Sequence, residues 1–114
     1  MSKAYELGLY EKAMPGTLTW KERLEAAKAA GYDYVEISID ATEEKIARLD
    51  MDRESRLELV KTMYETGIPI RTMCVSALTK YAIGSSDEAC CARGMAILEK
   101  SLQLADDLGI RVVM

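Results

Sequence analysis

Five polar residues could contact a small polar ligand: four follow or end predicted strands, and Glu36 lies at the centre of one with its side chain expected to point toward the mouth of a barrel. Glu11 and Lys12 follow the first predicted strand, Glu36 and Asp40 belong to the second, and Ser76 follows the third. A buried carboxylate without a partner is costly, so Glu36 must meet a substrate, water or a salt-bridge partner. Substrate contact is one interpretation of all five residues. A structural ion pair is the alternative for Glu36, and a solvated loop is the alternative for Glu11 and Lys12.

The chain contains no histidine, which removes the commonest general base and the commonest metal ligand. Its three cysteines, Cys74, Cys90 and Cys91, lack the C-x-x-C spacing of a zinc or redox site. We expect reduced thiols that pack as small apolar side chains. A redox role for Cys90 and Cys91 is the alternative, and the lack of a predicted positive charge near these thiols disfavours it.

Charge and hydropathy argue against two classes of partner. The formal net charge is −4, and lysines and arginines are scattered among acids, so we expect no nucleic-acid partner. No apolar run approaches the roughly 20 residues that a membrane helix needs. The N-terminus lacks the apolar segment of a signal peptide. We therefore expect a cytoplasmic protein with no membrane partner.

Three segments repeat one pattern, in which a helix end is followed by a glycine, a short spacer and a β-rich run. The glycines are Gly31, Gly67 and Gly109, at intervals of about 40 residues. Glycine just past a helix can adopt the left-handed conformation that ends it. Alternating helices and strands at this period predict βα units and a parallel sheet.

The predicted helices have recognisable starts and apolar faces. Thr19 to Glu22 and Ser85 to Glu88 fit capping boxes, and Asp52 is the expected cap of the second long helix. Residues 43–49 are expected to form a short extra helix whose mixed charges face solvent. The expected buried positions are Leu57, Val60 and Tyr64 on the second long helix, Cys91, Met95, Leu98, Leu102 and Ala105 on the third, and Met73 and Trp20 elsewhere.

The second strand favours a barrel over an open doubly wound sheet. Val35, Ile37 and Ile39 share one face, and Glu36, Ser38 and Asp40 share the other. A central strand of a doubly wound sheet is usually apolar on both faces, whereas a barrel strand can line an active-site mouth. No G-x-G-x-x-G follows the first strand, which is expected at residues 6–10. We predict an α/β fold: three βα units plus a fourth strand, the N-terminal part of a (β/α)8 TIM barrel of about 250 residues.

Several stretches, in order, resemble the N-terminal part of the L-ribulose-5-phosphate 3-epimerase family, whose relatives include hexulose-6-phosphate isomerases. They are LGLYEKAMP, GYDYVEISIDATEEKIARLD, ETGIPIRTMCVSA, IGSSDE and LADDLGIR. The resemblance covers essentially all of residues 1–114. Close members have S-A-H-R-R after the third strand where this chain has Ser76-Ala77-Leu78-Thr79-Lys80, so Leu78 replaces a histidine.

The resemblance implies a xylose isomerase-like TIM barrel that epimerises a ketopentose 5-phosphate at C3. It also implies a divalent metal (Mn, Mg or Zn) and two acid–base carboxylates, all held by later strands of the family. No catalytic residue and no metal ligand is therefore expected within this chain. The resemblance implies a sugar-phosphate substrate for the full-length enzyme.

The fourth strand begins near Ile110, and the sequence ends within it. We expect residues 1–114 to be one unit whose open sheet edges invite self-association. Alone, the unit is expected to be inactive and marginally folded, or else self-associated. The alternative function is a non-catalytic partial barrel, an assembly module completed by another chain.

Overall fold

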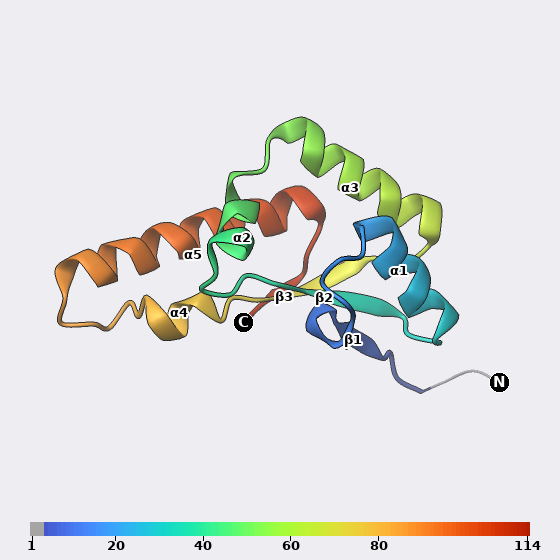
Figure 1. Cartoon of the computed structure of the whole chain (residues 1–114), viewed down its shortest axis with the longest axis horizontal. Coiled ribbons are helices and arrows are strands. Elements are labelled where there is room, and N and C mark those ends of the chain that lie inside the picture. Colours follow the sequence, from blue (N-terminus) through green and yellow to red (C-terminus); the bar gives the residue numbers. More distant parts are fainter. Residues whose placement is uncertain (1–3) are drawn as a thin grey trace.

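The computed structural model describes residues 4–114, which form one parallel sheet with helices packed along it (Figure 1). The strands are β1 (Gly8–Tyr10), β2 (Tyr34–Ser38), β3 (Ile70–Cys74) and β4 (Val112–Val113), in the order β1-β2-β3-β4. The helices are η1 (Glu11–Ala13), α1 (Trp20–Ala29), α2 (Glu43–Ile46), η2 (Ala47–Asp50), α3 (Arg53–Thr66), α4 (Ala77–Lys80) and α5 (Glu88–Leu108). The predicted βα order is confirmed, although β1 is shorter than the expected residues 6–10.

The long helices α1, α3 and α5 all lie on one side of the sheet (Figure 1). Between them and the strands lies the core, in which Val35, Ile37 and Ile39 of the second βα unit are completely buried. Helices on one face of a parallel sheet are the arrangement of a barrel wall, whereas a doubly wound sheet is covered on both faces. The predicted fold class is therefore confirmed.

Residues in register across the strands line up on the opposite, inner face of the sheet. Tyr10 pairs with Glu36, Glu36 with Thr72, and Thr72 with Val112. The register shifts by one residue at Arg71, because Val35 pairs with Ile70 whereas Glu36 pairs with Thr72. Such a bulge changes the direction in which a side chain points. The guanidinium carbon of Arg71, the extra residue, lies 5.3 Å from the centre of the Tyr34 ring. The bulge keeps Glu36 and Thr72 on one face.

Local signals place most helix ends where the sequence predicted them. The Thr19 hydroxyl accepts from the Glu22 N–H, and the Glu22 carboxylate accepts from the Thr19 N–H, so the capping box of α1 is confirmed. Gly67 and Gly109 end α3 and α5 with φ of 76° and 74°, a conformation that glycine adopts without steric cost. The box predicted at residues 85–88 is wrong, because Asp87 alone caps α5 through its carboxylate.

The predicted buried faces of the two longest helices are largely wrong. On α3 the buried residues are Leu59, Met63 and Thr66, whereas Leu57 and Tyr64 are 55% and 85% exposed. The expected face of α5 is exposed or half-buried except at its last position, Ala105, and Met95 is therefore not a core residue. The buried residues of α5 are Gly94, Ile97, Ser101, Leu104, Ala105 and Leu108. Both helices thus turn a different stripe toward the sheet.

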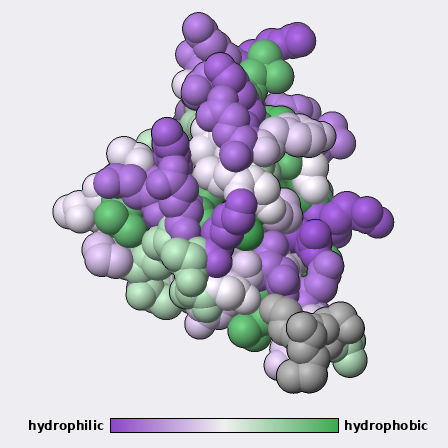
Figure 2. All heavy atoms as spheres, turned by 90° about the vertical axis from the view of Figure 1, so that its right-hand side faces the viewer, coloured by the Kyte–Doolittle hydropathy of each residue, from purple (hydrophilic) through white to green (hydrophobic). Residues whose placement is uncertain are grey.

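On the face drawn in Figure 2, hydrophilic side chains dominate and hydrophobic ones form small, separate patches. Within the described residues, none of the helices combines the length and apolar character needed to span a bilayer.

Candidate functional site

Two cross-strand hydrogen bonds connect polar side chains on the inner face of the sheet. The Thr72 hydroxyl of β3 donates to the Glu36 carboxylate of β2 at 2.7 Å. The Tyr10 hydroxyl of β1 donates to the Ser38 hydroxyl of β2 at 3.0 Å. Both contacts are partly buried, and Glu36 is half-buried. Ser38 is completely buried, so the inner face offers a ligand one carboxylate, that of Glu36, and the hydroxyls of Tyr10 and Thr72.

The environment of Tyr10 disfavours its ionised form. Burial raises the pKa of the Tyr10 phenol, and the neighbouring Cys74 thiol adds to that increase, while the bond to Ser38 opposes it. The result is a pKa above the ordinary value of 10.0. Tyr10 therefore serves as a neutral hydrogen-bond donor and acceptor at physiological pH.

Lys12 and Asp40 form an ion pair at the carboxyl ends of β1 and β2, the edge that forms the active-site mouth of a barrel. The Lys12 ammonium lies 2.6 Å from the Asp40 carboxylate. Burial opposes ionisation of Asp40, but Lys12 and the two donors of Thr42 outweigh it and lower its pKa to about 2. The hydrogen bond to Asp40 likewise raises the pKa of Lys12. Both groups are thus charged at neutral pH.

Glu11 is 3% exposed, and its carboxylate is fully engaged by neighbouring groups. Lys45 contacts one oxygen at 2.9 Å, and Arg48 contacts the other at 2.6 Å. The Ser38 N–H also donates to the second oxygen, at 2.8 Å. Burial would raise the pKa of Glu11, but the bonds from Arg48, Ser38 and Lys45 outweigh it and leave the pKa below its ordinary value.

This cluster corrects one expectation about residues 43–49. Lys45 and Arg48 do not face solvent, because their side chains are only 13% and 12% exposed. Arg48 also donates to the Ser38 carbonyl oxygen at 2.9 Å. The cluster therefore holds the segment after β2 against η1, next to the carboxyl ends of the first two strands.

Ser76 follows β3, and its placement differs from that of the other predicted site residues. It is half-buried, and its carbonyl oxygen accepts from the Thr79 N–H and hydroxyl at 3.0 and 2.7 Å. Two residues on, Leu78 packs against the hydrophobic core. Leu78, the position at which the resemblance led us to expect a histidine, is therefore an apolar packing position here.

The structure brings together only part of the predicted set. Lys12 contacts Asp40, whereas Glu11 is enclosed by Lys45 and Arg48. Glu36 has a partner, Thr72, that sequence reasoning did not single out as a site residue. The alternation of polar residues in β3 carried the signal for Thr72, but the bulge at Arg71 was needed to bring it opposite Glu36.

The residues present do not fit a divalent metal. Among residues 4–114, no three acidic, cysteine or histidine side chains come close enough together to hold an ion. The inner-face carboxylate of Glu36 is bonded to a hydroxyl, and Asp40 is paired with Lys12. These groups can instead bind and orient a hydroxylated ligand.

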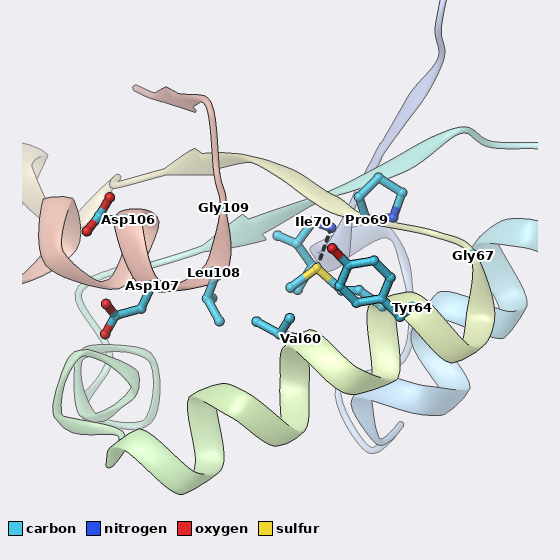
Figure 3. A pocket seen from close by; sticks show the side chains of 10 residues that line it. Val60, Tyr64, Gly67, Pro69, Ile70, Asp106, Asp107, Leu108 and Gly109 are labelled. Carbon is cyan, nitrogen blue, oxygen red and sulfur yellow. Dashed lines mark hydrogen bonds between the residues drawn. The ribbon is translucent and has the colours of Figure 1, made fainter.

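An apolar cavity of about 520 Å³ lies at the opposite end of the sheet (Figure 3). Its walls include Val60 and Tyr64 of α3, Leu108 at the end of α5, and Ile70 at the start of β3. The Ile70 N–H is bonded to the Met63 sulfur at 3.2 Å. Residues at the amino-terminal ends of barrel strands serve stability, so this cavity is separate from the candidate site.

The chain belongs to the xylose isomerase-like TIM barrel family, whose sequence pattern matches residues 24–114. Over 113 residues it is 48% identical to the L-ribulose-5-phosphate 3-epimerase UlaE of Escherichia coli O139:H28 and to that of Escherichia coli O157:H7. The UlaE of Shigella sonnei is equally similar. The alignments cover 99% of this chain and 40% of each relative, so the chain spans less than half of their length.

Solved structures share the fold at low sequence identity. A D-psicose 3-epimerase superposes with a TM-score of 0.76 at 19% identity, over 96% of this chain and 36% of its own. A D-allulose 3-epimerase from Methylomonas sp. superposes with a TM-score of 0.69 at 23% identity, over 95% of this chain and 35% of its own. Both similarities support the barrel-wall architecture and the partial coverage.

Proposed function

We propose that this chain supplies the first four strands of a sugar-phosphate 3-epimerase that interconverts L-ribulose 5-phosphate and L-xylulose 5-phosphate. The observation that carries the proposal is the 48% identity to L-ribulose-5-phosphate 3-epimerases over 99% of the chain. The polar inner face supports it, because a barrel of this family places its substrate at the carboxyl ends of the strands.

In this proposal the chain's own residues bind and orient the substrate rather than transfer its C3 proton. Glu36, held by Thr72, accepts a hydrogen bond from a sugar hydroxyl. Lys12, Asp40 and Ser76 line the rim at the ends of the first three strands. Glu11 does not contact the substrate in this proposal. Its ion pairs with Lys45 and Arg48 hold η1 and the segment after β2 in place beside the substrate.

The divalent metal and the two acid–base carboxylates belong to strands that follow the fourth in the full barrel. A bound metal in such an enzyme stabilises the charge that develops when the C3 proton is removed. Since the described residues do not fit a metal, the chain alone is proposed to be inactive. The three cysteines, which have no disulfide partner, suit a reducing cytoplasm.

Self-association is also part of the proposal. β1 and β4 are the two end strands of the sheet, so each offers one edge without a partner among the described residues. Unpaired edges promote pairing with another chain. Completion by another chain would turn the unit into an assembly module, and sedimentation of the purified chain distinguishes a monomer from an oligomer.

A chimeric enzyme tests the proposed function. Residues 1–114 replace the aligned part of the Escherichia coli O157:H7 relative, which supplies the rest of the barrel. We expect the chimera to convert L-ribulose 5-phosphate to L-xylulose 5-phosphate with a kcat/KM within about tenfold of the unaltered relative. A chimera that melts cooperatively but does not epimerise this substrate would overturn the proposal.

A further inference from the structure

Arg23 on α1 is a buried cation without an acidic partner. The residue is 6% exposed, and its guanidinium carbon lies 4.9 Å from the centre of the Trp20 ring. One terminal nitrogen donates to the Gly16 carbonyl oxygen at 3.1 Å. The Nε is buried and has no partner within the described part of the chain, and no carboxylate pairs with this guanidinium there. A buried charge of this kind normally has a counter-charge.

A polar cavity of about 440 Å³ adjoins Arg23 and is also lined by Lys12 and Lys45, which are paired with Asp40 and Glu11. The remaining lining residues are Glu11, Met14, Gly16 and Glu44. Glu11 does not pair with Arg23, because its carboxylate is already engaged by Lys45 and Arg48. Glu44 is exposed and forms no ion pair with Arg23 among the described residues. Arg23 therefore remains uncompensated beside a space that a small anion can enter.

We propose that this cavity binds a phosphate group, with Arg23 as the uncompensated cation that attracts it. Lys12 and Lys45, which keep their ion pairs with Asp40 and Glu11, add ammonium N–H donors at its wall. The guanidinium of arginine matches the oxygens of a phosphate through paired hydrogen bonds, and lysines add charge. The cavity lies beside η1, directly after β1, on the same side as the Lys12–Asp40 pair. The phosphate is carried either by a sugar phosphate, in which case the inference rests on the proposed function, or by a free phosphate ion.

Trp20 is the only tryptophan in the chain, and its fluorescence reports on the cavity through its contact with Arg23. Its ring lies 4.9 Å from the Arg23 guanidinium and 5.1 Å from that of Arg48. We expect inorganic phosphate to change its fluorescence with saturation, in a titration held at constant ionic strength with sodium chloride. A change that sodium chloride alone reproduces, or one that does not saturate, would overturn the proposal.

Substitutions in and outside the cavity test whether Arg23 binds the phosphate. Arg23→Gln is expected to weaken phosphate binding at least about tenfold, because it removes the positively charged guanidinium and its paired N–H donors. Arg53→Gln, which removes an exposed arginine from α3, is the matched control and should leave the affinity unchanged. Equal affinity in the two variants would contradict the proposal.

Two further variants keep the test decisive if Arg23→Gln does not fold. A side chain at Gly16 meets no atom within 4 Å of its Cβ, so Gly16→Glu can place a carboxylate in the cavity without a steric clash there. This variant should abolish phosphate binding, whereas Glu44→Gln should strengthen it by removing a competing negative charge. If Gly16→Glu binds phosphate as tightly as the unaltered chain, the cavity is not the site.

Parallel titrations distinguish a site for a sugar phosphate from a site for the free phosphate ion. The three ligands are inorganic phosphate, L-ribulose 5-phosphate and L-ribulose. Tighter binding of the sugar phosphate than of either other ligand would identify a substrate subsite. Equal binding of the two phosphates would identify a site for the free ion, and both results support a phosphate site. Calorimetry on the chimera repeats the titration. An active chimera whose phosphate binding does not depend on Arg23 would overturn this inference but leave the proposed function intact.

Discussion

The Glu11 carboxylate lies 2.6 Å from the Arg48 guanidinium, although the two residues are 37 positions apart in the chain. Lys45 approaches the same carboxylate at 2.9 Å, so two cations share one buried acid. The contact joins η1 to the segment after β2. It thereby holds together the two loops that flank the candidate site.

Removing this acid should destabilise the fold strongly. Glu11→Gln leaves Lys45 and Arg48 without their counter-charge in a largely buried setting, and we expect a loss of about 3 kcal/mol in the free energy of unfolding. Urea denaturation followed by circular dichroism measures it. Glu65→Gln, which breaks the exposed pair with Lys61, is the control and should cost less than about 0.5 kcal/mol. Similar losses for both variants would show that the buried cluster contributes little.

Protonation of Asp40 and Glu11 should lower the free energy of unfolding in acid. The pKa of Asp40 is about 2 in the folded chain and 3.8 ordinarily, and that of Glu11 is lowered from 4.5. A carboxyl whose pKa is depressed by folding stabilises the folded state above its unfolded pKa, and this contribution is lost as the pH falls through the folded value. Stability should therefore decrease from about pH 4.5 toward pH 2.

Asp40→Asn tests the contribution of one group to that slope. The variant should lose less stability than the unaltered chain between about pH 3.8 and pH 2, because the linked proton is no longer bound. Thermal melts across this range provide the measurement, and Asp106→Asn serves as a control at an exposed position on α5. Identical slopes for Asp40→Asn and the unaltered chain would refute the assignment.

Gly94 of α5 packs against the end of α4. A Cβ built there would lie 2.2 Å from the Tyr81 carbonyl oxygen, a backbone atom that has little freedom to move. Gly94→Ala should therefore destabilise the chain by about 1–3 kcal/mol, despite the higher helix propensity of alanine. Gly84→Ala, whose added Cβ meets nothing within 4 Å, should be nearly neutral. A stabilised Gly94→Ala in differential scanning calorimetry would contradict this packing.

Ser101 on α5 is completely buried, and its hydroxyl has no hydrogen-bond partner among the described residues. An unsatisfied buried hydroxyl is unfavourable, so Ser101→Ala should stabilise the chain by about 1 kcal/mol. The exposed Ser86 provides the comparison, since Ser86→Ala removes no buried polar group. A lower melting temperature for Ser101→Ala would show that the hydroxyl makes a favourable contact.

Local signals predicted the fold, whereas contacts between distant segments decided the site. Glycines such as Gly67 and the alternation around Glu36 carry their information within a few residues. The apolar residues of α5 form two stripes, one around Met95 and Leu102 and one around Ile97 and Leu104. Helical periodicity does not say which stripe faces the sheet.

The environment of Glu11 was equally inaccessible from the sequence. Its cationic partners lie 34 and 37 residues away, and the local pattern predicted only substrate contact or a solvated loop. The pairing of Glu36 with Thr72 likewise depends on a bulge that no sequence pattern revealed.

The most direct test of the central claim measures kcat/KM for L-ribulose 5-phosphate in the chimera with Glu36→Gln. If Glu36 binds a sugar hydroxyl on the inner face, kcat/KM should fall about tenfold or more, because a hydrogen bond to a charged group contributes about 1.5–3 kcal/mol. The control is Glu58→Gln on the exposed surface of α3, which should leave kcat/KM unchanged. Equal values for the two variants, both folded, would contradict the claim that this face of the sheet contacts the substrate.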